Sequence, residues 1–319
     1  MNIDACNAMA RAAPPEPAPA RLALVFGSGG VKSAAALGVA EVLAAEGLQP
    51  DLVVGCSAGA VFGALVAAKL PSRECIATAT RLWSREITSV RRRGALLHAA
   101  WAPVGTGLSR RFEERFALRD DHLILDRMRQ AFGSQRLEDL PVRMLVNATD
   151  AASGQPVLLS RGSVCDALRA SVALPFLFAP HRVGDRLLID GSVSDPLPVG
   201  AAAEARAVVA LGFEVPKPRH VGDATRLATR VTAALTNNLL RAQLATHARP
   251  QLITLLPELE RRVGLFDADA MPYLIELGRE HARGILPRLK QLLLQPSAEA
   301  PAAARPHGGG PPQLRLHVA

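Results

Sequence analysis

The chain has 319 residues, of which 49% are apolar, and this content is enough to bury a large core in one or two domains. The formal net charge is +8, but only 4% of the residues are aromatic and no nucleic-acid-reading motif is recognisable, which argues against nucleic-acid binding. The four cysteines are scattered without CxxC or Cys/His metal spacing, which predicts free thiols in a reducing compartment and no metal site.

The N-terminal twenty residues do not predict a secretory signal, because prolines interrupt them and no continuous apolar stretch follows a charged start. Residues 1–20 and 296–319 are rich in Ala, Pro and Gly, and are predicted to be disordered tails. No apolar run reaches the length needed to span a bilayer. The expected localisation is cytoplasmic, with reversible binding to a membrane surface as a further expectation.

The first predicted strand, Leu22–Phe26, leads into a glycine-rich loop and then a small-residue helix over Ala34–Leu43. The loop reads Gly27-Ser28-Gly29-Gly30-Val31-Lys32-Ser33. Glycines at a strand–helix junction leave backbone N–H groups unshielded at the positive end of a helix, which suits a phosphate or an oxyanion. The Walker A and Rossmann spacings both fail, because larger residues stand where those patterns need glycine. A nucleotide-binding regulator remains an alternative, although no acidic Mg²⁺ site accompanies the loop.

A second strand–turn–helix unit carries a serine. The apolar run Leu52–Val54 leads into Gly55-Cys56-Ser57-Ala58-Gly59, and a helix-like run follows over Ala60–Ala68. In such an elbow the serine is exposed in a strained turn, with glycines where any Cβ would clash. Cys56 is expected to point away from the serine, which disfavours a thiol mechanism. Alone, the pattern also fits a plain strand–helix turn.

Arginines, leucines and aromatic residues interleave over Arg91–Phe116. This pattern suits a lid or a docking segment for an anionic membrane surface. A solvated helical surface packed on the core explains the same pattern, and the sequence leaves both interpretations open.

Another apolar run, Leu187–Ile189, ends in Asp190-Gly191-Ser192, which places a carboxylate at a strand terminus. Asp-Gly is a common turn dipeptide, so this observation alone predicts only a turn. Beyond it, the pattern predicts a helix over Ala224–His247, a strand over Leu252–Leu256 on a possible sheet edge, and a largely helical stretch over Ala268–Leu294. Pro272 is expected to mark the start of that stretch, and Pro287 a break within it.

In this order, the glycine loop, the serine elbow and Asp190-Gly191-Ser192 resemble the motifs of the patatin-like phospholipase family, in its bacterial branch. The connecting segments Val146–Asp150, Ser153–Val157 and Ala167–Phe176 resemble the family as well, so the similarity covers residues 20–215. The resemblance implies an α/β fold of the patatin-like three-layer α/β/α type with a mostly parallel central sheet. Residues 21–215 are expected to form the catalytic core, and residues 216–295 a helical and strand extension of the same domain.

The resemblance also implies a chemistry, the hydrolysis of carboxylic esters of lipids without cofactor or metal. Ser57 would attack the ester carbonyl, and Asp190 would orient Ser57 and accept its proton. The elbow glycines are Gly55 and Gly59. The loop expected to hold the oxyanion comprises Gly27, Ser28, Gly29, Gly30, Val31 and Lys32. The Lys32 side chain is expected to reach water. The lipid class, the position cleaved and the oligomeric state stay open.

Three residues depart from the family pattern: Ser33 and Ser192 stand where small glycine or alanine residues are usual, and Asp195 stands where asparagine is common. All three are small or near-isosteric changes and are interpreted as variants of a working site. The alternative outside the enzymes is a catalytically silent patatin-like protein that binds lipid or a protein partner.

The rival hydrolase chemistry is a Ser-His-Asp triad on an α/β-hydrolase fold. The late histidines offer no obvious base from their surroundings, and each is interpreted as a surface or packing residue: His181, His220, His247, His281, His307 and His317.

Overall fold

The computed structural model describes residues 19–83, 122–217, 220, 222 and 224–295. The predicted tails, apart from residues 19 and 20, and the basic segment Arg91–Phe116 lie outside the described residues. The strands are β1 (Leu22–Phe26), β2 (Leu52–Cys56), β3 (Arg143–Asp150), β4 (Pro156–Leu159), β5 (His181–Val183), β6 (Arg186–Asp190), β7 (Ala207–Leu211) and β8 (Leu252–Leu255). The α-helices are α1 (Ala35–Ala45), α2 (Ala58–Ala67), α3 (Ser72–Leu82), α5 (His122–Phe132), α6 (Val164–Ser171), α7 (Ala224–Thr246) and α8 (Met271–Leu294).

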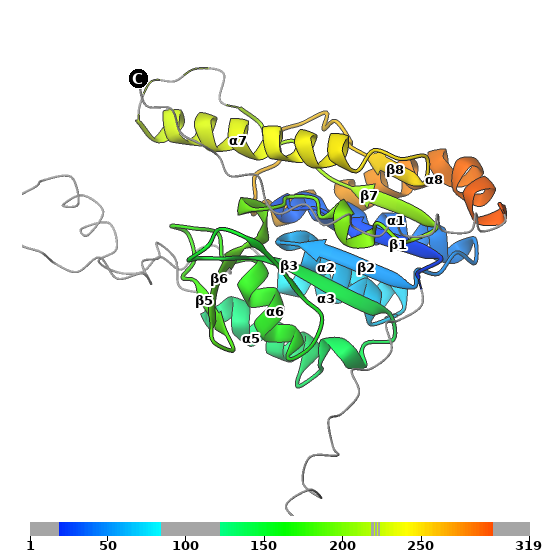
Figure 1. Cartoon of the computed structure of the whole chain (residues 1–319), viewed down its shortest axis with the longest axis horizontal. Helices are drawn as coiled ribbons and strands as arrows, with labels where there is room; N and C mark the ends of the chain where they lie inside the picture. The colour runs from blue at the N-terminus through cyan, green and yellow to red at the C-terminus, as the bar shows by residue number, and fades with distance from the viewer. Residues whose placement is uncertain (1–18, 84–121, 218–219, 221, 223, 296–319) are drawn as a thin grey trace, which may run out of the picture.

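The strands form one sheet in the order β5-β6-β3-β2-β1-β7-β8, with β4 paired to β3 (Figure 1). The run from β3 to β8 is parallel, and β4, β5 and β6 add antiparallel pairs. The carboxyl ends of the five parallel strands therefore meet at one edge of the sheet, where α/β proteins usually place their ligand sites. The predicted strand over Leu252–Leu256 is confirmed as edge strand β8.

Helices cover both faces of the sheet because alternate residues of the buried strands point to opposite sides. In β1, Leu22, Leu24 and Phe26 pack in the core cluster that includes residues of α1, α2 and α8. Ala23 and Val25 pack in a second cluster, with residues of α7 and of the 3₁₀ helix η6 (Val199–Ala202). The predicted three-layer α/β/α fold with a mostly parallel sheet is confirmed.

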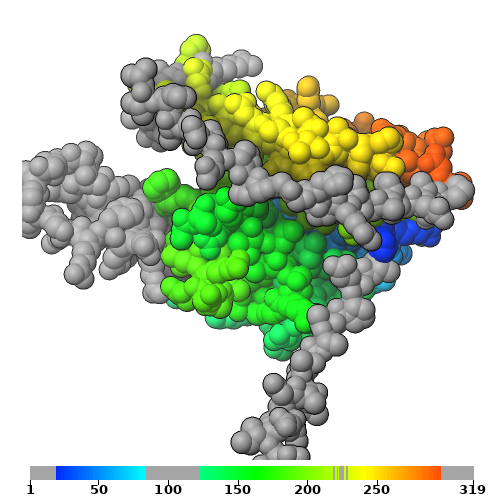
Figure 2. All heavy atoms as spheres, viewed as in Figure 1, coloured from blue at the N-terminus to red at the C-terminus, as the bar shows by residue number. Residues whose placement is uncertain are grey.

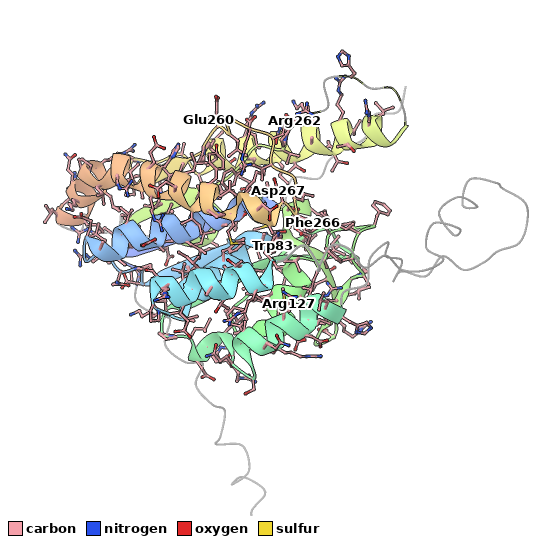
Figure 3. The ribbon with its side chains drawn as sticks, turned by 180° about the vertical axis from the view of Figure 1, so that it is seen from behind. Trp83, Arg127, Glu260, Arg262, Phe266 and Asp267 are labelled. Carbon is pink, nitrogen blue, oxygen red and sulfur yellow. The ribbon has the colours of Figure 1, made fainter. Side chains whose placement is uncertain are left out.

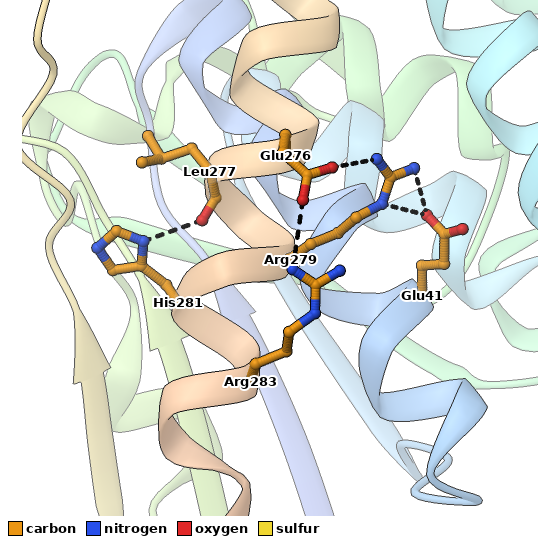
Figure 4. A network of polar contacts seen from close by, with 6 residues as sticks. All are labelled: Glu41, Glu276, Leu277, Arg279, His281 and Arg283. Atoms are coloured by element: carbon orange, nitrogen blue, oxygen red, sulfur yellow. Dashed lines mark hydrogen bonds and ion pairs between the residues drawn. The ribbon is translucent and has the colours of Figure 1, made fainter.

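The C-terminal helix α8 packs closely on α1, the helix that follows the glycine loop. Arg279 of α8 donates to Glu41 of α1 at 2.8 Å and to Glu276 at 2.7 Å (Figure 4). In this picture Arg283 approaches the other oxygen of Glu276, and His281 contacts the carbonyl of Leu277. Helix α8 thus packs against both α1 and the glycine loop that precedes it.

The predicted break at Pro287 is wrong, because α8 runs without interruption from Met271 to Leu294. Proline removes one intrahelical hydrogen bond, here the bond to the carbonyl of Arg283. Both residues lie on the exposed side of the helix, where water can satisfy that carbonyl. Buried Leu289 and Leu293 hold the following turns on the core, so packing outweighs the local cost. Pro272 does mark the first turn, as expected.

A search of the described helices for a membrane span gives a negative result, since none of them is both long and apolar enough to cross a bilayer.

Candidate active site

Ser57 occupies a strained turn between β2 and α2. Its φ and ψ are 55° and −130°, outside the range that most residues with a side chain adopt. A Cβ on Gly55 would overlap the backbone of Ala60, and one on Gly59 would overlap the carbonyl oxygens of Phe26 and Gly27. A side chain at either position would therefore clash with the backbone, so this turn requires glycine at both.

The sheet brings Ser57 and Asp190 together although 133 positions separate them in sequence. Cys56 pairs with Asn147 of β3, and Ala148 of the same strand pairs with Asp190, the last residue of β6. The Ser57 Oγ donates a hydrogen bond of 2.7 Å to Asp190 Oδ2. The Asp190 carboxylate is almost fully buried.

Burial raises the pKa of the Asp190 carboxyl above its ordinary value of 3.8, because desolvation disfavours the charged form. Hydrogen bonds from the Ser192 N–H, at 2.8 Å, and from the Ser57 hydroxyl act in the opposite direction and lower the pKa of Asp190. The Ser192 hydroxyl also lowers the pKa of Asp190. The serine that departs from the family pattern therefore adds a donor beside the carboxylate.

A layer of polar residues lies behind Ser57 and Asp190, and the sequence alone predicts no role for these residues. The Ser171 hydroxyl accepts from the Ser57 N–H at 2.8 Å and donates to the Asn147 carbonyl at 2.6 Å. Asn147 Nδ2 donates to the carbonyls of Gly191 and Asp195, at 3.1 and 2.9 Å. These bonds tie the serine turn to the Asp190 turn through β3. The segments containing Asn147 and Ser171 were noted for their resemblance, but no local pattern reveals such cross-strand bonds.

The glycine loop lies against the elbow, because its strand β1 pairs with β2 and its start faces Gly59. The N–H groups of Gly27, Ser28 and Val31 donate to Leu211, Pro196 and Leu265 carbonyls, each at 2.8 Å. Within the described part of the chain, the N–H groups of Gly29 and Gly30 have no acceptor. The loop thus offers two unpartnered donors beside the elbow.

Ser33 fits the loop without strain, since its φ is not positive. Its hydroxyl donates to the Gly27 carbonyl at 3.0 Å and closes the loop on itself. The hydroxyl supplies a bond that glycine at this position would lack.

The expectation that Lys32 reaches water is wrong. The side chain is buried, its Nζ donates to the Glu214 carbonyl at 3.2 Å, and it lies 5.4 Å from the ring centroid of Phe213. Burial lowers the pKa of Lys32 to about 8. Lys32 fastens the glycine loop to the segment after β7, where the cation meets a carbonyl dipole and an aromatic face.

Cys56 is buried and points away from the turn surface, as expected, with its Sγ 3.9 Å from Asn147 Nδ2. Burial and the charges of Asp190 and Asp195 raise the pKa of this thiol. A neutral thiol is a poor nucleophile, so the residue serves the packing of the elbow. Cys75 and Cys165 are also free and buried.

None of the described histidines hydrogen-bonds to Ser57 or Asp190. His181 pairs with Asp166 at 3.0 Å, and His247 and His281 each contact the carbonyl four residues earlier in their own helix. These contacts agree with packing or surface roles. Likewise, no group of three or more His, Cys, Asp and Glu side chains in the described ranges is placed to hold a metal ion.

An apolar cavity includes Val61 of α2, one helical turn after Ser57, in its lining. Trp83 stacks on Phe266 with 6.3 Å between ring centroids, and the two lie near each other in Figure 3, with Arg127 of α5 to one side. Phe266 also meets Phe178 edge-on at 6.3 Å. The cavity is lined by Val61, Leu82, Trp83, Ile124, Met128, Val172, Phe178 and Phe266.

Asp195 is half-buried behind the pair, and desolvation raises its pKa from 3.8 to about 6, although the charge of His247 acts to lower it. A raised pKa means that the folded state holds the proton more tightly. This contribution to stability is complete below pH 3.8 and is lost as the pH rises through about 6.

Replacement of Asp195 by asparagine is therefore expected to raise the free energy of unfolding at pH 8 by about 1–2 kcal/mol, with little change at acidic pH. The asparagine oxygen can still accept from the Leu197 N–H, which Asp195 Oδ1 does at 3.1 Å. Urea unfolding at several pH values measures the effect, with exposed Asp166→Asn as the control. Equal gains at all pH values would contradict the assignment of the cost to the Asp195 charge.

Comparison with known proteins identifies a family from the sequence. The family model for patatin-like phospholipases matches residues 24–203, more than half of the chain. An uncharacterized NTE family protein of Mycobacterium tuberculosis is 32% identical over 222 residues, which cover 70% of this chain and 56% of that protein. A lysophospholipase of Yarrowia lipolytica, NTE1, is 26% identical over 194 residues, covering 61% of this chain and 12% of that protein. The chain therefore spans about half, or much less, of the length of these relatives.

Among solved structures, VipD from Legionella pneumophila is similar with a TM-score of 0.44 and 14% identity, over 85% of this chain and 66% of that one. The sequence match of the family model includes the glycine loop, the elbow and the Asp190 turn. The chain belongs to the patatin-like phospholipase family.

Proposed function

We propose that this protein is a serine acyl hydrolase that cleaves carboxylic esters of lipids. The observation that carries the proposal is the 2.7 Å hydrogen bond from the Ser57 hydroxyl to the buried Asp190 carboxylate. Membership of the patatin-like phospholipase family supports lipid hydrolysis as the class of activity. The relative named lysophospholipase supports a lysophospholipid or phospholipid as the ester.

In the proposed reaction, Ser57 Oγ attacks the ester carbonyl while Asp190 accepts the hydroxyl proton. The alcohol then leaves the tetrahedral intermediate, taking the proton back from Asp190, and an acyl-enzyme on Ser57 remains. The N–H groups of Gly29 and Gly30, together with the N–H of Ala58 at the start of α2, stabilise the charge on the carbonyl oxygen. Water then enters with Asp190 as its base, and the fatty acid is released. The raised pKa of Asp190 makes it a better base than an ordinary carboxylate.

The apolar cavity supports a lipid as the acyl donor. Val61 lies one helical turn from Ser57, and Val172 follows Ser171, which accepts from the Ser57 N–H. An acyl chain whose carbonyl carbon reaches Ser57 can extend its first carbons toward this aromatic wall. The hydrophobic effect then favours esters of longer acyl chains over acetyl esters. No cofactor takes part in the proposed scheme.

Release of fatty acid tests the proposal with lysophosphatidylcholine, phosphatidylcholine and a triacylglycerol as separate substrates. Wild-type protein is expected to release fatty acid from at least one of them, and Ser57→Ala from none. A well-folded wild type that releases none, and that also fails to hydrolyse p-nitrophenyl butyrate, would favour a silent lipid- or protein-binding role.

A further inference from the structure

The carboxyl edge of the sheet carries an unusual set of exposed apolar side chains, which we call the apolar rim: Phe176, Val193 and Leu265. Their exposed fractions are 69%, 46% and 47%. Of the nine large apolar residues that are exposed in the described ranges, these three stand on segments that build the active site. Of the remaining six, Leu256 follows β8 at the same edge of the sheet, and three lie on α7, the helix that forms the yellow surface of Figure 2.

Each rim residue is connected to the candidate catalytic groups by the backbone. Val193 ends the 3₁₀ turn Gly191–Val193 that begins directly after Asp190. The carbonyl of Leu265 accepts from Val31 in the glycine loop at 2.8 Å. Phe176 lies in the loop after α6, in which the Ala173 carbonyl accepts from the Asp190 N–H at 3.0 Å. The three residues therefore border one site from three segments.

Phe176 is held outward against its own backbone preference. Its φ is 67°, in the left-handed region that a bulky residue rarely adopts. Two hydrogen bonds to the Leu174 carbonyl, from the N–H groups of Leu177 and Phe178, close the turn around it. Phe178 is buried against Phe266, whereas Phe176 gains no comparable packing. The strained backbone at Phe176 is not offset by packing of its side chain, and such strain is typical of residues that serve a function rather than the stability of the fold.

A basic groove adjoins the rim. The described residues that line the groove include Lys217, His220, Arg226 and Arg262. Its wall includes Val263 and Gly264, which lead directly into Leu265 (Arg262 and Phe266 are labelled in Figure 3). Apolar side chains bordered by cations match the boundary between the acyl chains and the negative headgroups of an anionic bilayer.

We propose that the apolar rim, with Phe176 as its most exposed member, docks this face of the protein onto an anionic lipid surface so that the active site opens toward the bilayer. This inference rests on the proposed function for its substrate class. Phe176 and Leu265 enter the acyl region while the groove lies over the headgroups. None of the residues named for the rim and the groove belongs to the basic segment Arg91–Phe116.

The test uses Phe176→Asn, because asparagine tolerates a positive φ and preserves the turn while the apolar ring is lost. Leu294→Gln is the matched control, since Leu294 is 81% exposed at the far end of α8, which begins beside the glycine loop and runs away from this edge. Both changes are placed in a Ser57→Ala background, so that the vesicles are not hydrolysed. Co-sedimentation is measured with vesicles of phosphatidylcholine, with and without an equal part of phosphatidylglycerol.

The Ser57→Ala protein is expected to bind the anionic vesicles, to bind neutral ones weakly, and to lose binding at high salt. Phe176→Asn is expected to lower the partition onto anionic vesicles about ten-fold, and Leu294→Gln to leave it unchanged. With Ser57 restored, Phe176→Asn is expected to hydrolyse p-nitrophenyl butyrate at the wild-type rate.

Three results would overturn the inference: no vesicle binding at all, binding unaffected by Phe176→Asn, or binding lost instead by Leu235→Gln on the outer side of α7. A dimer of the lipid-free protein that dissociates on Phe176→Asn would assign the rim to a second copy of the chain. Failure of the proposed function has a different signature, because ester hydrolysis would then be absent while vesicle binding by the rim persists.

Discussion

Replacement of Asp190 by asparagine is expected to lower kcat/KM for a soluble ester such as p-nitrophenyl butyrate by about 10³–10⁴-fold. The change preserves the size of the side chain and an oxygen that can accept from the Ser192 N–H, now at 2.8 Å. It removes the acceptor of the Ser57 proton, which Asp190 Oδ2 meets at 2.7 Å. An amide has no basic site for that proton, so the serine is no longer activated.

The same variant separates catalysis from folding. Because burial raises the pKa of Asp190, its charge costs stability at neutral pH, and this cost disappears in asparagine. The free energy of unfolding at pH 8 is therefore expected to stay equal or to rise while activity falls. Asp166→Asn, on the surface, serves as the control and should retain activity. An active Asp190→Asn protein would show that this carboxylate is not the base.

The pH dependence of wild-type activity follows from the same pKa. The base must be unprotonated, so kcat/KM is expected to fall on the acid side as the pH drops through the pKa of Asp190 in the free protein. That midpoint should lie above 3.8, the ordinary value of the carboxyl. A profile with a midpoint at or below the ordinary value would contradict a buried carboxylate base.

Replacement of Gly278 by alanine is expected to destabilise the protein by about 3 kcal/mol, the second large effect. Gly278 lies where α8 meets α1, and a Cβ there would overlap the backbone carbonyl of Ala35. Backbone atoms cannot move aside as a flexible side chain can, so the two helices must separate. The facing Gly38 has the same relation to the carbonyl of Ile275.

Gly284 of the same helix provides the matched control, because a Cβ there meets no atom within 4 Å. Gly284→Ala is expected to stabilise the protein by about 0.5–1 kcal/mol, since alanine is the better helix former and restricts the unfolded chain. Urea unfolding of both variants at one pH measures the difference. Equal effects of the two substitutions would show that α1 and α8 are not in close contact.

Much of the fold follows from local pattern. The strand predicted at Leu22–Phe26 has those bounds in β1, because five consecutive apolar residues between turn signals fit a strand buried on both faces. Local rules failed at Pro287, where the helix continues because buried leucines beyond the proline outweigh one lost hydrogen bond. They failed again at Lys32, whose burial depends on Phe213 and Glu214, distant in the sequence.

In the candidate site, too, some features follow from local sequence and others depend on tertiary contacts. The elbow glycines are predictable because their neighbours lie within one strand–turn–helix unit and its adjoining strand. By contrast, the bridge that Ser171 makes between Ser57 and Asn147 joins three separate elements, and only the tertiary structure reveals it. The outward position of Phe176 likewise depends on a turn over residues 174–177, in which Phe176 takes the left-handed position that glycine usually fills.

The most direct test of the central claim is labelling with a fluorophosphonate, which reacts covalently with an activated serine, followed by mass spectrometry of the peptides. A single adduct on Ser57 is predicted for the wild type, none for Ser57→Ala, and a strongly reduced amount for Asp190→Asn. An adduct on another residue, or no adduct on well-folded wild-type protein, would contradict the assignment of Ser57 as a nucleophile activated by Asp190.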